Sequence, residues 1–343
     1  MTIAPISRRR MMILSAGAAL AFEGCRRSSR SSGRSRVGLL YFAPEAGAEL
    51  CMKGIFDGLA QEGFTRDHNL DVISSHAQGE ISSIPMLVRN FMTQGVDLIL
   101  TLTTPCLTAA CAVARTTHIA FTYCYDPVAA GAGKSFSDHL PNVTGVGSFP
   151  PVEATVDLIH KLVPHVKAVG TIYNSSEANS VKVISVAREI FRNRGIALQE
   201  VTATNTSEVF QAAQVASYRG VQAMWVTGDN TALQSFDAIA KATTAAKLPL
   251  FINDPEFTSR GAVACVGLGW YSPGKAGGVL AARLLRGEDP ARIPFQEVAE
   301  QKLVLNEQAA ARLGIVFPPD VQKAAQSQAE SDGLILSPRA QPC

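Results

Sequence analysis

The feature that most constrains this fold is a regular alternation of short apolar runs with amphipathic helical stretches. Predicted strands lie at 37–42, 70–73, 96–101 and 119–123, and helical spacing follows the first three of them at 49–61, 82–94 and 106–115. Short strands alternating with helices of this length are typical of parallel sheets that helices cover on both faces. The first half of the chain is therefore predicted to be an α/β unit.

The alternation starts again after Pro150 and Pro151. Predicted helices at 152–162, 180–193, 207–217 and 233–246 alternate with predicted strands at 168–173, 197–201, 221–227 and 248–252. A restart of this kind indicates a second α/β unit, and 343 residues are enough for two domains of ordinary size.

The N-terminus has the pattern of an export signal. Arg8, Arg9 and Arg10 precede a 12-residue apolar run at 11–22. A basic start and a short apolar run are typical of a secretory signal, and the run is too short for a spanning helix. The preceding Ser7 gives the arginines a resemblance to a twin-arginine signal. Residues 1–24 are predicted to be an export signal.

Two maturation routes are open at the end of this signal. Gly24 and Cys25 resemble the end of a bacterial lipobox, whose cysteine receives a lipid, although Phe22 and Glu23 depart from that pattern. The Ala-Leu-Ala at 19–21 instead suits ordinary signal peptidase. We favour lipidation of Cys25, with residues 25–36 as a polar tether that has no apolar residues with which to build a core.

The charge of the body argues against a nucleic-acid partner. The whole chain is formally +2, but residues 1–36 hold eight arginines and one acidic residue. The remainder holds 23 basic and 28 acidic groups, a net charge of −5. A protein that binds a polyanion needs the opposite sign.

The cysteines and histidines suggest no metal centre. Five of the seven cysteines lie in apolar segments, where a free thiol behaves as a small hydrophobic group. No pair has zinc-type spacing, and no histidine falls in a recognisable motif. We expect no structural metal, no cofactor and no essential disulfide.

Polar residues gather where the predicted strands end. In open α/β sheets, ligands bind at the carboxyl ends of strands, where the next helix presents unpaired N–H groups. Each of these residues also suits a helix cap or a turn, so the collective pattern carries more weight than any single position. The polar candidates for ligand binding are Thr103, Thr104, Asp126, Asn174, Ser176, Glu177, Ser180, Asp229, Asn230 and Asp254, and the aromatic candidates are Phe42, Tyr125 and Trp270.

The order of these stretches resembles the substrate-binding proteins of bacterial ABC importers. It is most similar to the branch of type I periplasmic binding proteins that includes aromatic amino-acid binders, over about 37–317. The stretches that carry the resemblance are IAFTYCYDP at 119–127, NVTGV at 142–146, YNSSEANS at 173–180, GDN at 228–230, GAVA at 261–264 and the segment 274–287. Members often carry Asp-Tyr where this chain has Gly269 and Trp270, so the ligand cannot be copied from a relative.

The resemblance implies two Rossmann-like lobes with parallel sheets, joined by a three-segment hinge. Lobe one would comprise 37–146 and 269–291, lobe two 147–268 and 292–318, and 319–343 would be a loosely held tail. The hinge segments would be 142–148, 263–269 and 293–296.

The function that the resemblance implies is capture of a small solute, an amino acid or a derivative, for an ABC permease. Thr103, Thr104 and residues 176–180 would hold a carboxylate. An ammonium group would need Asp126, Asp229 or Asp254, and Phe42, Tyr125 and Trp270 would offer stacking faces. The protein would act as a monomer in the periplasm or at the outer face of the cytoplasmic membrane.

Two alternatives remain from other functional classes. The same fold serves as a ligand sensor for a membrane receptor. An exported hydrolase would need a nucleophile with a base, and the chain has no Gly-x-Ser-x-Gly elbow, Walker loop or dinucleotide fingerprint. We therefore expect no enzymatic activity.

Overall fold

The computed structural model describes residues 33–298 and 301–331. The predicted export signal at 1–24, Cys25 and the end of the chain beyond residue 331 lie outside the described residues. None of the helices within the described ranges is long and apolar enough to cross a membrane.

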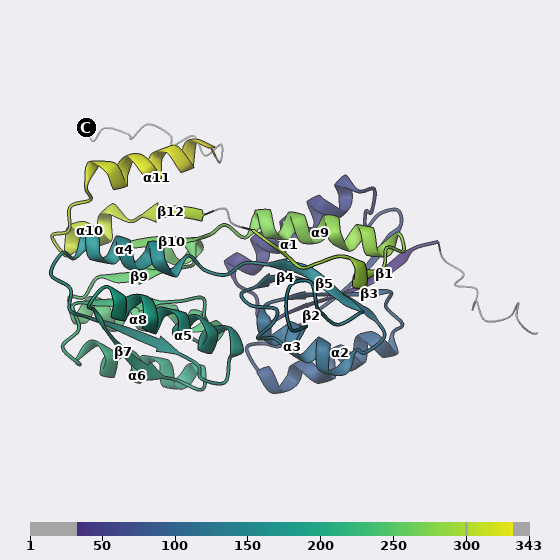
Figure 1. Ribbon diagram of the computed structural model, residues 1–343, viewed down its shortest axis with the longest axis horizontal. Coiled ribbons are helices and arrows are strands. Elements are labelled where there is room, and N and C mark those ends of the chain that lie inside the picture. The colour runs from purple at the N-terminus through teal and green to yellow at the C-terminus, as the bar shows by residue number, and fades with distance from the viewer. Residues whose placement is uncertain (1–32, 299–300, 332–343) are drawn as a thin grey trace, which may run out of the picture. The chain divides into compact units, whose positions relative to one another are not determined.

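The first sheet has six parallel strands in the order β11-β5-β4-β3-β1-β2 (Figure 1). Helices α1 and α9 pack together on one face, and α2 and α3 cover the other. These elements form the first lobe, whose strands are β1 (Ser35–Tyr41), β2 (Leu70–His76), β3 (Leu98–Leu102), β4 (His118–Cys124), β5 (Val143–Gly147) and β11 (Gln296–Glu297). Its helices are α1 (Ala46–Gln61), α2 (Ile84–Thr93), α3 (Thr104–Val113) and α9 (Tyr271–Leu285), with short 3-10 turns η1 (Ile81–Ser83) and η4 (Pro290–Arg292).

The second sheet repeats this plan in the order β12-β10-β9-β8-β6-β7, with only β12 antiparallel to its neighbour. Helices α4 and α5 lie on one face, and α6 and α8 on the other. The strands of this second lobe are β6 (Ala168–Tyr173), β7 (Ala197–Thr202), β8 (Ala223–Val226), β9 (Leu250–Ile252), β10 (Ala264–Leu268) and β12 (Gln301–Leu305). Its helices are α4 (Val152–Leu162), α5 (Ala178–Asn193), α6 (Val209–Ser217), α7 (Asn230–Gln234), α8 (Phe236–Ala245), α10 (Glu307–Arg312) and α11 (Pro319–Ser331), with η2 (Thr206–Glu208) and η3 (Pro255–Arg260).

Burial explains why these runs form interior strands. Every residue of β3, β5, β8, β9 and β10 is buried, as expected for strands that helices cover on both faces. The edge strand β7 is instead partly exposed along its length. The predicted two-unit α/β architecture is confirmed.

The chain crosses between the sheets three times. It passes from β5 to α4 through residues 148–151, and from β10 to α9 through Gly269 and Trp270. The third crossing falls after Glu297, because β11 pairs with β5 in the first sheet. The predicted crossing at 293–296 was therefore a few residues early, and the assignment of 292–297 to lobe two was wrong.

The predicted loose tail is also wrong at its beginning. Residues 319–331 form α11, which packs against β12. Val321 is buried, and Asp320 pairs with Lys161 of α4. An apolar contact and an ion pair therefore hold this helix on the second lobe.

Candidate functional site

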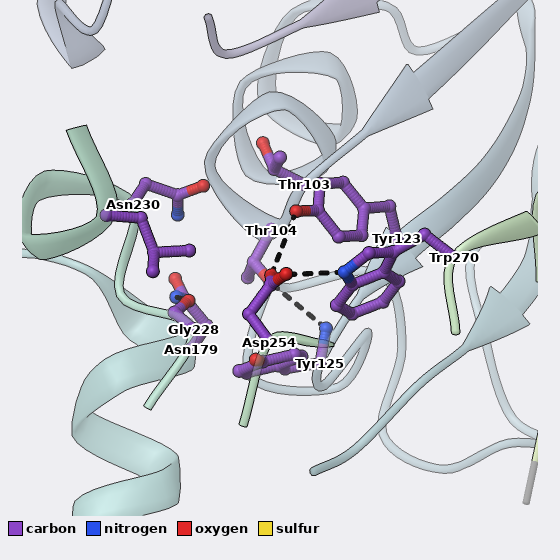
Figure 2. A pocket seen from close by; sticks show the side chains of 10 residues that line it. Thr103, Thr104, Tyr123, Tyr125, Asn179, Gly228, Asn230, Asp254 and Trp270 are labelled. Carbon is purple, nitrogen blue, oxygen red and sulfur yellow. Dashed lines mark hydrogen bonds between the residues drawn. The ribbon is translucent and has the colours of Figure 1, made fainter. Parts of the chain in front are cut away.

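A pocket lies between the carboxyl ends of the strands of the two lobes (Figure 2). Its cavity has a volume of about 20 Å³, which is room for about one water molecule. It is lined by Thr103, Thr104, Tyr123 and Tyr125 of the first lobe, by Asn179, Gly228, Asn230, Leu233 and Asp254 of the second, and by Trp270 at the crossover.

The backbone of the first lobe is strained where it meets the pocket. Thr103 has φ 79° and ψ 151°, a region that residues other than glycine rarely occupy. Tyr123 has φ 54° and lies at a register shift between Phe121 and Cys124 of β4. The N–H of Thr103 donates to the carbonyl of Tyr123 over 3.1 Å, so the two irregularities support each other. Strained positions of this kind concentrate at functional sites.

Asp254 is the acidic centre of the pocket. Its Oδ2 accepts a hydrogen bond from Trp270 Nε1 at 3.1 Å and lies 3.5 Å from the hydroxyl of Tyr123 (Figure 2). Its Oδ1 is buried and has no partner among the described residues. The pocket lining includes no lysine, arginine or histidine within the described chain. Asp254 Oδ1 can therefore accept a hydrogen bond from a cationic group, and the side chain of Glu256 lies within hydrogen-bonding reach of the same carboxyl group.

Two more carboxyl groups lie close to Asp254. Glu45 accepts from the Tyr123 hydroxyl at 2.9 Å and caps α1 through the N–H groups of Gly47 and Ala48. Glu256, on η3, has a buried Oε2 without a partner in the described residues. Burial raises the pKa of Asp254 well above its usual range, and the neighbouring Glu256 and Glu45 raise this pKa further. An ammonium group at this position would offset the repulsion among the three carboxylates.

Aromatic rings enclose the acidic centre. The ring of Trp270 lies 3.9 Å from that of Tyr123 in an edge-to-face arrangement and 6.3 Å from that of Tyr125 in a stacked one. Such pairs add stability beyond the burial of their surface. All three rings are buried.

Two helices begin at the pocket with unoccupied polar groups. The first turns of α3 and α5 receive no hydrogen bond from a capping side chain. Asn179 Oδ1, at the start of α5, is buried without a partner among the described residues, and the buried hydroxyl of Thr103, at the start of α3, lies near the thiol of Cys106. The N-terminus of a helix favours negative charge because its first N–H groups are unpaired.

A second acidic pair, Glu177 and Asp229, is used inside the second lobe. Both oxygens of Glu177 accept bonds from Asn230 and Thr231 at the start of α7, at 2.6–3.0 Å. Asp229 accepts from the N–H of Asn174, the N–H of Ala232 and the hydroxyl of Ser180 at 2.6–2.7 Å. Burial, with the neighbouring Glu177 charge, raises the pKa of Asp229 to about 7. This pair caps α7 and ties it to α5.

The structure brings some of the sequence candidates to the pocket and not others. Those that line it are Thr103, Thr104, Tyr125, Asn230, Asp254 and Trp270. Those that it does not bring to the lining are Phe42, Asp126, Asn174, Ser176, Glu177, Ser180 and Asp229.

The candidate residues outside the pocket have other structural roles. Phe42 is buried in the core beneath α2 and α3. Asp126 accepts from the N–H groups of Val128 and Ala129, each at 2.9 Å, and so caps its own turn. Asn174 likewise accepts from the N–H of Ser176. Asp126 and Asn174 therefore form a cap and a turn, the local roles that aspartate and asparagine commonly have.

The site includes residues that the sequence reasoning did not select. Tyr123, Asn179, Gly228 and Leu233 line the pocket, with Glu45 behind Tyr123. Except for Leu233, these residues lie at predicted strand ends or helix starts. Their place at the ends of the predicted elements was therefore the feature that could have identified them. Gly228 is required because a Cβ there would overlap the Tyr125 hydroxyl.

The described cysteines and acidic residues form no metal site. No group of three or more histidine, cysteine, aspartate or glutamate side chains within the described ranges is placed to hold a metal ion. Cys51, Cys106, Cys111, Cys124 and Cys265 are buried free thiols.

Two α/β lobes joined by three crossovers, with a polar pocket between their strand ends, define a type I periplasmic binding protein. The family model for ABC transporter substrate binding proteins matches residues 36–329. The chain therefore belongs to that family.

Relatives of this chain include amino-acid binders. It is 27% identical over 278 residues to the tyrosine-binding protein of Clostridioides difficile strain R20291, covering 81% of this chain and 80% of the relative. A Streptococcus pneumonia ABC domain in complex with L-Trp is 28% identical with a TM-score of 0.82, covering 85% of this chain and 98% of that one. A ligand-free, open substrate-binding protein from Clostridium difficile is 26% identical with a TM-score of 0.64, covering 83% and 97%. The chain superposes better on the tryptophan complex than on the open form.

Proposed function

We propose that this protein captures an α-amino acid, or a closely related ammonium-bearing solute, between its lobes and delivers it to an ABC permease. The observation that carries the proposal is the buried Asp254, which has a free oxygen and no basic side chain beside it in the pocket. The names of the relatives, one a tyrosine binder and one a tryptophan complex, support the same ligand class.

The ligand's ammonium group would lie between Asp254 Oδ1 and Asn179 Oδ1. Both atoms are buried acceptors without a donor among the described residues, and an ammonium group has three N–H donors and no acceptor. A hydrogen bond to a charged group of this kind contributes about 1.5–3 kcal/mol. Among the acids suggested by the sequence, Asp254 is preferred because Asp229 and Asp126 already accept backbone bonds.

The ligand's carboxylate would lie at the starts of α3 and α5. These helices come from different lobes, so one carboxylate would bridge them and favour closure. The hydroxyl of Thr103, at the start of α3, would donate to the same group. The two ends of a zwitterion thus match two opposite electrostatic regions of the pocket.

The proposal also covers the location of the protein in the cell, which is inferred from the sequence alone. The basic start at Arg8–Arg10 and the apolar run at 11–22 suit export, and Cys25 suits lipid attachment at the membrane surface. A solute-binding protein in that position acts by binding and release, without turnover of the ligand.

The test is thermal unfolding of the folded body, residues 33–343, against a panel of amino acids. A ligand at about 100 times its dissociation constant adds about 2.7 kcal/mol to the free energy of unfolding. Asp254→Asn should abolish this gain, because truncating the charge that a buried ammonium pairs with costs about 2–5 kcal/mol. At a pH where Asp254 is ionised, the same variant should unfold at a higher temperature without ligand, since it removes a buried charge from beside Glu256 and Glu45.

Asp237→Asn is the matched control, because Asp237 is an exposed residue of α8 that pairs with Arg260. It should keep the full ligand response. A panel in which no amino acid stabilises the wild-type protein would refute the proposed ligand class. A normal ligand response in Asp254→Asn would refute the role of Asp254.

A further inference from the structure

Trp270 lines the pocket next to Asp254. It lies at the crossover between β10 and α9 and is 1% exposed. Its ring packs between those of Tyr123 and Tyr125, on the same side of the cavity as Asp254 (Figure 2).

Three separate contacts hold this ring in place. Its Nε1 donates to Asp254 across the lobes at 3.1 Å. Its ring packs edge-to-face with that of Tyr123, with ring centroids 3.9 Å apart. A Cβ added to Gly47 at the start of α1 would lie 2.8 Å from Trp270 Cδ1, so the backbone of α1 closes the remaining side. These contacts hold the indole in one orientation beside Asp254.

The space that remains is too small for a second aromatic ring. The cavity has a volume of about 20 Å³, whereas a cavity of about 150 Å³ is the kind that admits benzene. A ligand of any size therefore has to separate the lobes to enter, and an aromatic side chain beside Asp254 would in addition have to displace the ring of Trp270.

We propose that Trp270 is the specificity-determining residue of this pocket and restricts its ligand to a compact, non-aromatic amino acid or amine. This inference rests on the proposed function and narrows it. The relatives described as binding tyrosine and tryptophan have ligands that carry the aromatic ring themselves. In this chain the aromatic ring in the pocket belongs to the protein itself, as the side chain of Trp270.

The experiment is isothermal titration of the folded body with glycine, alanine and serine on one side, and phenylalanine, tyrosine and tryptophan on the other. Wild-type protein should bind at least one compact ligand and should bind each aromatic ligand at least tenfold more weakly. Trp270→Ala opens the space of the indole and should improve affinity for at least one aromatic ligand by at least tenfold. Trp270→Phe still fills much of that space and should retain the preference for compact ligands.

The possible outcomes distinguish a failure of this inference from a failure of the proposed function on which it rests. Tight binding of tyrosine or tryptophan by the wild-type protein would overturn the inference and leave the proposed amino-acid function intact. Failure of Trp270→Ala to gain aromatic ligands, in protein that unfolds cooperatively, would overturn the role of Trp270. Wild-type protein that binds no member of the panel would overturn the proposed function itself. Because the wild-type titrations decide the first and third outcomes, the inference remains testable even if Trp270→Ala does not fold.

Discussion

At the residue scale, the pocket depends on side chains held in unfavourable backbone conformations. Thr103 occupies a region of φ and ψ that only glycine tolerates well, and its side chain makes no cap hydrogen bond to the start of α3. A strained residue costs about 1–3 kcal/mol. Thr103 lines the pocket, and ligand binding is a use of this position that would offset the strain.

Thr103→Gly should therefore separate stability from binding. The glycine removes the strain, which stabilises the folded state. The greater conformational freedom of glycine in the unfolded chain offsets about 0.5–1 kcal/mol of that gain. We expect the free energy of unfolding in urea to rise by about 1 kcal/mol while ligand affinity falls. Thr103→Ala is the control, because alanine loses the hydroxyl but keeps the strain. Lower stability in Thr103→Gly than in Thr103→Ala would contradict this account.

At the element scale, α1 and α9 position two residues of the site. Glu45 caps the start of α1, and Trp270 immediately precedes α9. The two helices run parallel, and their backbones touch where glycines face each other. The glycines at this contact are Gly54, Gly58, Gly274 and Gly278. A Cβ on any of them would overlap a backbone carbonyl of the opposite helix. The small residues thus bring Glu45 and Trp270 to the same end of the helix pair.

Gly278→Ala should force α9 away from α1. Adding a methyl group to a well-packed interface costs about 1–3 kcal/mol, and the displacement should also weaken ligand binding by moving Trp270. Gly33→Ala is the control, since a Cβ there meets nothing within 4 Å. Urea unfolding and ligand titration of both variants measure the two effects. Unchanged stability in Gly278→Ala would show that the helices can separate without cost.

At the scale of the whole molecule, buried carboxyl groups make stability depend on pH. Asp229 has a pKa raised to about 7, chiefly by burial, and burial also raises the pKa of Asp254. In the unfolded chain an aspartate has a pKa of about 3.9. Between about pH 4 and 7 the folded protein therefore binds more protons than the unfolded one, so its stability falls as pH rises.

The ligand-free protein should consequently have a larger free energy of unfolding at pH 5 than at pH 7.5. Ligand binding should change in the opposite direction, because an ammonium group pairs with the ionised form of Asp254. Urea unfolding at both pH values, with and without ligand, measures both trends. Asp229→Asn should reduce the pH dependence of the ligand-free protein. A stability that rises from pH 5 to pH 7.5 would contradict the raised pKa values.

The sequence by itself determined the α/β architecture, because strands buried on both faces are apolar throughout and amphipathic helices repeat their pattern every 3.6 residues. It also predicted a ligand site at the strand ends, and Thr103, Asp254 and Trp270 of that prediction line the pocket. Only the tertiary structure decided which polar groups face the pocket. Asp229 and Glu177 are as polar as Asp254, but folding directs their oxygens to the start of α7. Tyr123 and Glu45, 78 positions apart in the chain, meet at 2.9 Å only when β4 and α1 pack in one lobe. Local patterns reflect the periodicity of single elements, whereas the direction of a side chain at a strand end depends on contacts between elements distant in sequence.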